Sequence, residues 1–301
     1  MLNAYHRLPP ALKGLLLMLA ATVAFASMHA AIRHASTGLH PFEIAFFRNF
    51  FMLILLLPVL QRVGFGVLRT QRLGLYALRG ALNTVAMLSF FFALSITPLV
   101  QVTALGFSAP LFATLGAALI LGEVVRMRRW MAMIVGFAGT LVILRPGLVE
   151  IDTGSMLVLF SSAMWALALL CIKKLSATES SVAITAYMAI FMAPMTLVAA
   201  IPFWQWPTLE QYAALGLIAF LGTIAQTCMN QALHEADAST VLPVDFAKLI
   251  WTTALGYLLF AEIPDAWTYV GGSMIFGAAT YIGIRESRLK QSDKPKDTAQ
   301  D

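Results

Sequence analysis

Two stretches of the sequence, 139 residues apart, decide the fold: TALGFSAPLFATLGAALILGE (103–123) and LPVDFAKLIWTTALGYLLFAE (242–262). At this shift residues 93–123 align with residues 232–262 without a gap. Each stretch is an apolar run of the length that crosses a bilayer as a helix, which is about 20 residues. Each run ends on a glutamate, which indicates a cap or loop anchor rather than a chemical role. The matching positions include Phe107 with Phe246, Thr114 with Thr253, and Glu123 with Glu262.

A second alignment extends the repeat towards the beginning of each half. A shift of 140 places GLLLMLAATVAFASMHAAIRH (14–34) on GSMLVLFSSAMWALALLCIKK (154–174), with a glycine at the start and a basic pair at the end of both. The sequence therefore predicts two copies of one unit, 12–145 and 154–285. The polar segment that follows, 286–301, is expected to be a disordered cytoplasmic tail.

The composition is typical of a protein embedded in lipid. Of the 301 residues, 59% are hydrophobic and 12% are charged, whereas a soluble domain has about 25% charged residues. The net charge of +5 does not indicate nucleic-acid binding, because the basic residues lie in short loops where the anionic leaflet is the expected partner. The connections leave no room for a soluble catalytic domain. Apolar runs predict ten spanning helices, near 12–32, 42–61, 74–95, 99–121, 129–145, 154–173, 182–203, 210–231, 238–260 and 267–285.

The distribution of Lys and Arg predicts the orientation of these helices. With the N-terminus in the cytoplasm, fifteen of the twenty Lys and Arg fall in inside segments, and two, Arg33 and Arg145, fall in outside loops. We therefore expect both termini in the cytoplasm and the chain in a bacterial inner membrane. Because each unit has five helices, the second copy enters the membrane from the opposite side. Inverted repeats of this kind are typical of secondary transporters, in which the substrate binds near the midplane between the halves.

Two charges inside the ninth predicted helix break the repeat. Asp245 and Lys248 stand where the first unit has Gly106 and Ala109, and a charge at the bilayer centre costs about 2.5–3.5 kcal/mol. A spacing of three places the pair on one helix face, and Thr252 continues that face. The proline two residues before Asp245 predicts a bent or locally open helix. We interpret the pair as an anchor for a substrate or coupling ion; a self-neutralised pair that only joins helices is the alternative.

Other polar or aromatic side chains in the predicted spans are weaker candidates for the same site. Glu43 and Arg48 lie in the second helix and, like the ninth-helix pair, have no charged counterpart in the other unit. A surface pair with a snorkelling arginine is the alternative for these two. Packing between helices is the alternative for all the others. These others are Gln226 and Asn230, which share a stripe with Thr223 and His234, together with His29, Asn83 and Trp165, whose indole could stack on an aromatic or cationic substrate.

Sequence motifs for other chemistries are absent. The chain has no G-x-x-x-x-G-K-[ST] phosphate loop, no H-E-x-x-H, no C-x-x-C and no G-x-S-x-G. We therefore expect neither a nucleotide-driven pump nor an enzyme. The two cysteines, Cys171 and Cys228, lie within apolar runs and provide no disulfide framework and no metal-ligand spacing. No cofactor and no metal is expected.

The repeated unit resembles a known transporter family. The first stretch, followed by RRWMAMIVGFAGTLVIL (128–144), is similar to the fourth and fifth helices of the EamA repeat in the drug/metabolite transporter superfamily. PFEIAFFRNF (41–50) is similar to the second helix of that repeat, whose arginine falls on Arg48. The resemblance covers residues 12–285. It implies a ten-helix fold of two inverted repeats, with the site built by the first, third, fourth, sixth, eighth and ninth helices.

The second half adds a closer resemblance and one departure. DFAKLIWTTALGYLLFAEIPDAWTYVGGSMIFGAATYI (245–282) is similar to the branch that includes S-adenosylmethionine uptake carriers. The proline that the family has in the fourth helix is matched by Pro110, but the equivalent ninth-helix position is Leu249. The ninth-helix proline stands instead at Pro243, so the site there departs from the family pattern.

Together these observations predict a secondary transporter that moves a small polar or zwitterionic metabolite by alternating access. S-adenosylmethionine, or a related amine or amino acid, is the first candidate substrate; export of amino acids and carriage of riboflavin-like vitamins are alternatives. Asp245 would attract a substrate cation or exchange a proton, and Lys248 would engage a substrate carboxylate. A membrane subunit that packs against a partner and a lipid-modifying enzyme are the alternatives from other classes. The bilayer is the expected partner, and a proton, a counter-substrate and a second copy of the chain remain open.

Overall fold

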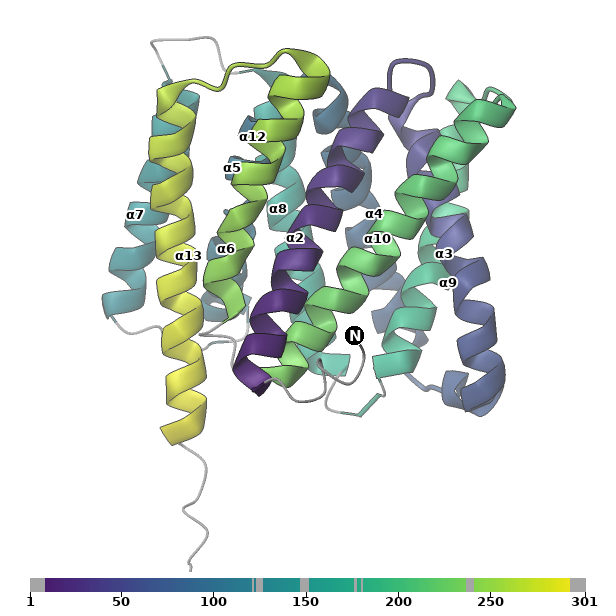
Figure 1. Ribbon diagram of the computed structural model, residues 1–301. Coiled ribbons are helices and arrows are strands. Elements are labelled where there is room, and N and C mark those ends of the chain that lie inside the picture. Colours follow the sequence, from purple (N-terminus) through teal and green to yellow (C-terminus); the bar gives the residue numbers. More distant parts are fainter. Residues whose placement is uncertain are drawn as a thin grey trace, which may run out of the picture.

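The computed structural model describes residues 9–120, 122, 127–146, 152–175, 178–179, 181–236 and 241–292. The regular structure of these residues is a bundle of helices arranged side by side (Figure 1). The first half contains α2 (Pro10–Ala35), α3 (Pro41–Val63), η1 (Phe65–Leu68), α4 (Leu73–Ile96), α5 (Leu99–Gly106), α6 (Ala109–Ile120) and α7 (Met127–Leu144). The second half contains α8 (Thr153–Leu175), α9 (Ser181–Ala200), η2 (Ile201–Phe203), α10 (Leu209–Glu235), η3 (Leu242–Phe246), α12 (Ala247–Phe260) and α13 (Ala266–Ser292).

Seven segments of the described chain are long and apolar enough to cross a membrane, and one shorter apolar helix, Trp130–Leu144, joins them. This confirms the all-helical membrane class, whereas the count of ten spans and the side of the termini stay predictions. The seven segments are Pro10–Ala35, Pro41–Val63, Leu73–Ile96, Leu99–Ile120, Thr153–Ile172, Ala183–Phe203 and Leu209–Ala232.

Helix packing is the same in the two halves. Helix α2 packs on α10 and α12, and correspondingly α8 packs on α4 and α6, while α3 packs on α9 and α7 packs on α13. Exchanging the two halves converts the contacts of α2 into those of α8, and it leaves the α3–α9 and α7–α13 contacts unchanged. The α7–α13 pair lies at one edge of the bundle and the α3–α9 pair at the opposite edge (Figure 1). The packing therefore follows the repeat that the two alignments predict.

The edge pairs show the inversion directly. Arg145 follows α7 and pairs with Asp265, which precedes α13, with 2.6 Å between Nη2 and Oδ2. Glu43, in the first turn of α3, accepts a hydrogen bond from the backbone N–H of Gln205, which follows α9. In each pair the end of one helix meets the start of its counterpart, so the counterparts are antiparallel. A two-fold axis in the membrane plane produces this relation.

Equivalent glycines allow equivalent close contacts. A Cβ atom on Gly14 would lie 2.6 Å from the Cβ of Ala236, and a Cβ on Gly154 would overlap the hydroxyl of Thr97. Gly14 aligns with Gly154, and Thr97 aligns with Ala236. Each glycine thus brings the first helix of one half against the end of the third helix of the other half, because it has no side chain to keep them apart.

The predicted span 99–121 is divided by a turn that the sequence did not predict, whereas the irregular start of the predicted span 238–260 agrees with the bent or locally open helix expected at Pro243. Helix α5 ends at Gly106 and α6 begins at Ala109, with a turn at Phe107 and Ser108 between them. In the second half a 3₁₀ turn, η3, ends at Phe246 and α12 follows. Phe107 and Phe246 are equivalent in the repeat. Nearby prolines lack a backbone N–H and cannot continue the α-helical ladder, which favours a break at these places.

Candidate functional site

The ion pair of the ninth segment lies at the break between η3 and α12. The Nζ atom of Lys248 is 3.0 Å from both carboxylate oxygens of Asp245. The two side chains keep 17% and 22% of their exposure, so the pair is largely shielded but still reachable. The aromatic rings of Phe25 on α2 and Phe107 at the α5–α6 break lie 5.4 and 5.5 Å from Nζ. Aromatic faces attract cations at such distances, so two side chains of the first half hold this lysine of the second half.

His29 lies one helical turn beyond Phe25 on α2. Its ring centroid is 5.2 Å from that of Phe90 on α4 and 6.3 Å from that of Phe25. Its Nδ1 atom is buried and has no hydrogen-bond partner. The imidazole also lies within electrostatic reach of Lys248 and Arg48. The structure therefore brings this predicted candidate to the ion pair.

Arg48 on α3 is the second cation near His29. Its Nη1 atom lies 3.9 Å from the sulfur of Met87 on α4, and its buried Nε has no hydrogen-bond partner. A Cβ atom on Gly222 of α10 would lie 3.4 Å from the same Nε, which shows how closely α10 approaches the guanidinium. We call His29, Arg48, Asp245 and Lys248 the central cluster.

Thr252 and Trp251 support the cluster from α12. Thr252 is fully buried, and its hydroxyl donates to the carbonyls of Lys248 and Leu249, so it is already engaged within its own helix. The indole N–H of Trp251 donates to the hydroxyl of Thr22 on α2 at 3.2 Å. These bonds fix α12 against α2, and they position Lys248 rather than offer free groups to a ligand.

Glu43 is placed apart from the cluster. Its carboxylate accepts hydrogen bonds from the backbone N–H of His40, at 3.1 Å, and of Gln205, at 2.7 Å. The His40 imidazole and Glu43 also form the capping box of α3. The carboxylate therefore holds the start of α3 to the end of α9, and a role for Glu43 in a site with Arg48 stays a prediction.

Among the described residues, no hydrogen bond, ion pair or ring contact joins the remaining candidates to the cluster. Gln226 donates to the side-chain oxygen of Asn230 at 3.1 Å, so these two amides satisfy each other on the face of α10. Trp165 keeps 43% of its exposure, whereas Asn83 is buried on α4, and a role of either at the site stays a prediction. The side chain of His234, at the end of the predicted stripe, is not among those that the structure describes.

Sequence reasoning missed a polar network at the end of the bundle where α2 and α12 finish. Arg33 donates to the carbonyls of Leu94 and Thr97 on α4 and lies 2.5 Å from the carboxylate of Glu262. Glu262 in turn accepts from the backbone N–H of Leu99, at 2.9 Å. This confirms Glu262 as a loop anchor; its counterpart Glu123 lies outside the described residues. The position of Arg33 beside a predicted outer loop was visible in the sequence. Its partners were not, because they are distant from it along the chain.

Asp152 extends this network from the second half. It accepts hydrogen bonds from the hydroxyls of Thr97 and Ser155, from the Ser155 backbone N–H and from the Gln101 amide. Burial raises the pKa of Asp152, but the hydrogen bonds from Ser155 and Thr97 outweigh burial and hold this pKa below its usual value. The network thus joins the two halves at this end through an ion pair and a charged acceptor.

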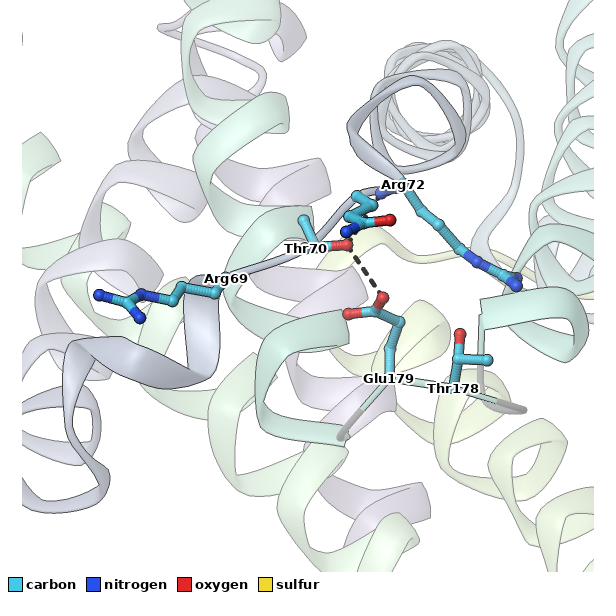
Figure 2. A pocket seen from close by; sticks show the side chains of 6 residues that line it. Arg69, Thr70, Arg72, Thr178 and Glu179 are labelled. Atoms are coloured by element: carbon cyan, nitrogen blue, oxygen red, sulfur yellow. Dashed lines mark hydrogen bonds between the residues drawn. The ribbon is translucent and has the colours of Figure 1, made fainter.

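A cleft of about 510 Å³ opens at the opposite end of the bundle (Figure 2). It is lined by Arg69, Thr70, Gln71, Arg72, Thr178 and Glu179. Glu179 accepts from the hydroxyls of Thr70 and Tyr76, and Figure 2 shows it pointing towards Thr70 while Arg69 points away. These contacts join the start of α4 to the segment after α8, so the cleft is a surface feature separate from the central cluster.

The comparisons agree with this architecture. The model of the EamA-like transporter family matches residues 12–145 and 152–284. The chain belongs to the EamA-like transporter family. The matches fall on the two halves that the packing relates, and they confirm the resemblance to this repeat of the drug/metabolite transporter superfamily.

Individual relatives are transporters by name. An S-adenosylmethionine uptake transporter of Rickettsia bellii is 32% identical over 256 residues, which is 85% of this chain and 88% of that protein. A riboflavin transporter of Vibrio cholerae is 33% identical over 288 residues, 94% of this chain and 97% of that protein. A pseudopaline exporter of Pseudomonas aeruginosa is 28% identical, over 92% of this chain and 97% of that protein. One solved structure is 17% identical to this chain and has a TM-score of 0.62. The match covers 92% of this chain and 98% of the chain in that structure, which shows the same fold.

The family establishes the class of function. This EamA protein is a small-molecule transporter and a multi-pass protein of the bacterial inner membrane, not an enzyme. The helical fold and the transporter class that the sequence predicts are confirmed. The substrate and the residues that bind it are questions for the site itself.

Proposed function

We propose that this EamA protein is a ten-span secondary transporter that binds a small polar or zwitterionic solute at the central cluster and moves it by alternating access. The observation that carries the proposal is the Asp245–Lys248 pair, which lies at a helix break of the second half and is shielded by the Phe25 and Phe107 rings of the first half. Ionisable groups inside a membrane protein are costly and are typically retained for binding or proton transfer. The cost is met here by an ion pair that a ligand can open.

The two charges supply complementary contacts. The carboxylate of Asp245 binds a cationic group or a proton, and the ammonium of Lys248 binds a carboxylate. When the site is empty each charge neutralises the other at 3.0 Å. Substrate and coupling ion therefore compete for one pair, which ties the occupancy of the site to the conformation of the protein.

The two broken helices support the same location. Turns at Phe107–Ser108 and at η3 leave backbone groups outside the regular α-helical ladder, close to Lys248. Transporters with inverted repeats use interrupted helices in this way to present polar groups near the midplane. Arg33, Glu262 and Asp152 close the end at which α2 finishes, so in this conformation the solute would enter and leave from the opposite end.

Two substrate classes are in agreement with this cluster. We propose S-adenosylmethionine or a related amine or amino acid first, because Asp245 and Lys248 match an ammonium and a carboxylate on one small molecule. A riboflavin-like vitamin is the second candidate, and the rings of Phe25, Phe90 and Phe107 near the cluster favour it. Relatives named for each class cover most of this chain.

The remaining parts of the proposal concern the arrangement in the membrane. The repeats are 12–145 and 154–285, both termini are cytoplasmic, and 286–301 is a disordered tail. Lys and Arg concentrated on one side support this orientation. A proton or a counter-substrate drives transport. The proposed arrangement in the membrane is compatible with a homodimer.

The test is exchange in proteoliposomes. The purified protein is reconstituted with unlabelled S-adenosylmethionine inside, or riboflavin in a parallel set, and entry of the same labelled compound is measured. Saturable exchange of one compound is expected, and Asp245→Asn should abolish it. Asp265→Asn is the matched control, because that aspartate is 41% exposed and pairs with Arg145 at the bundle edge. Exchange at the wild-type rate in Asp245→Asn would remove the proposal.

A further inference from the structure

We propose that Arg48 is an anion subsite of the central cluster and that the transported solute therefore has a carboxylate or another small anionic group. This inference rests on the proposed function, because it names the substrate chemistry of the same site. It gives the anionic group a contact at Arg48 beside the one proposed at Lys248, whose ammonium is shared with its own carboxylate partner, Asp245.

Arg48 is half-buried, and its guanidinium has no compensating group among the described residues. Its Nε atom is buried and lacks an acceptor, and its Nη1 atom faces the Met87 sulfur at 3.9 Å, which is a weak acceptor at a long distance. In the part of the chain that the structure describes, no carboxylate lies within 4.0 Å of this arginine. A guanidinium has five N–H donors, so most of its donor capacity is free.

Two other arginines of the same bundle have strong hydrogen-bond acceptors. Arg79 on α4 donates to the backbone carbonyl of Ile184 at 2.6 Å, and Arg33 donates to two carbonyls and pairs with Glu262. Both connect helices and so have structural partners. Among the described residues Arg48 reaches α4 through the Met87 sulfur and has no carbonyl or carboxylate acceptor, which separates it from arginines that are retained for packing.

The repeat shows that the scaffold does not need a charge at this position. The residue equivalent to Arg48 in the second half is Met188, an apolar side chain of comparable length. An uncompensated buried charge destabilises a fold, so its retention indicates an occupant that binds it. A carboxylate fits the planar fork of a guanidinium with two parallel hydrogen bonds.

The surroundings place this subsite beside the ion pair. His29 lies within electrostatic reach of both Arg48 and Lys248, and its Nδ1 is buried without a partner. Gly222 faces the guanidinium with no side chain of its own. The cluster has two cations and one carboxylate, so it has an excess positive charge whatever the state of His29. A solute anion bound at Arg48 would balance this charge.

A stability measurement tests the subsite without knowledge of the solute. The full chain, purified in detergent, is melted in sodium formate and in sodium chloride of equal ionic strength. Formate is expected to raise the melting temperature of the wild type more than chloride does. Arg48→Met should abolish the difference and should melt at or above the wild-type temperature in chloride. Arg48→Lys should keep a smaller formate shift, because an ammonium lacks the bidentate fork.

Arg79→Met is the matched control, because it removes a buried arginine that has a structural partner. It should lower the melting temperature and retain the formate shift; Arg79→Lys replaces it if it does not fold. The inference is overturned if Arg48→Met melts as low as Arg79→Met or fails to fold. It is equally overturned if formate has no specific effect on the wild type, or the same effect on Arg48→Met.

The exchange assay separates this inference from the proposed function. Loss of exchange in both Arg48→Met and Asp245→Asn supports both statements. If Arg48→Met exchanges solute at the wild-type rate and Asp245→Asn does not, the anion subsite is wrong and the transport site stands. Normal exchange in both variants removes the proposed site altogether.

Discussion

Replacing Glu262 by glutamine should open the end of the bundle where α2 and α12 finish. Glu262 pairs with Arg33 at 2.5 Å and accepts the backbone N–H of Leu99 at 2.9 Å, and both charged side chains are mostly shielded, with 12% and 19% exposure. Glutamine keeps the shape and one acceptor oxygen, so the change isolates the charge. Arg33 retains its bonds to the Leu94 and Thr97 carbonyls.

The magnitude follows from the type of bond that is lost. A hydrogen bond to a charged group contributes about 1.5–3 kcal/mol, and the partly retained contacts favour a net loss of about 2 kcal/mol. For a protein of this size a loss of about 2 kcal/mol lowers the melting temperature by roughly 4–8 °C. Since the pair joins the two halves, the same free energy shifts the equilibrium towards opening at this end by about 30-fold, at about 1.4 kcal/mol per tenfold.

The assay is labelling of a cysteine placed beside the central cluster. Phe25→Cys, in a background in which Cys171 and Cys228 are replaced by alanine, is exposed to a membrane-impermeant maleimide added from the side of the Arg33 end. Glu262→Gln should increase the labelling rate by about 30-fold. Asp265→Asn, which removes an ion pair at the bundle edge near the same end, should not change it, because a half-exposed pair contributes about 0–1 kcal/mol. Unchanged labelling in Glu262→Gln, or equal changes in both variants, would refute the reasoning.

Two further predictions concern stability. The pKa of Asp152 is lowered in the folded state. Its contribution to stability is therefore complete above the unfolded pKa of about 3.9 and is lost as pH falls through the folded value. In melting scans the difference between wild type and Asp152→Asn should be present at neutral pH and vanish in acid, and a difference independent of pH would contradict this. Gly154→Ala should cost about 1–3 kcal/mol, because the new Cβ overlaps Thr97. Gly216→Ala on α10, where no atom lies within 4 Å of the new Cβ, should instead stabilise by up to about 1 kcal/mol, and equal effects of the two substitutions would show that the contact at Gly154 is not constrained.

The helical scaffold could be predicted from the sequence because its determinants are repetitive and local. A spanning helix needs a long apolar run, and eight of the ten predicted segments coincide with one continuous described helix over most of their length, while 99–121 and 238–260 are divided. The alignment also predicts which contacts recur: Gly14 against Ala236 and Gly154 against Thr97 are the same contact in the two halves. The break in the first half was harder to predict. Neither Phe107 nor Ser108 is a strong helix breaker, and the turn there depends on the prolines and on packing around it.

The site was only partly predictable, because periodicity places a side chain on a face but does not identify its partner. Asp245 and Lys248 lie three residues apart, so their pairing could be predicted and is observed. Glu43 was interpreted with Arg48, five residues away, but its partner is the backbone of Gln205, which the chain brings back from the other half. The pairing of Arg33 with Glu262 is hidden for the same reason. Such contacts exist only once the two repeats are packed together.

Equilibrium binding to the purified protein tests the central claim most directly, because it reports on the Asp245–Lys248 pair without the other steps of transport. The solute that the wild type exchanges is titrated against wild type, Asp245→Asn and the control Asp265→Asn. Loss of a charge-assisted contact of about 1.5–3 kcal/mol should weaken binding by about 10–150-fold in Asp245→Asn and leave Asp265→Asn unchanged. Binding of wild-type affinity in Asp245→Asn would show that the solute is held elsewhere.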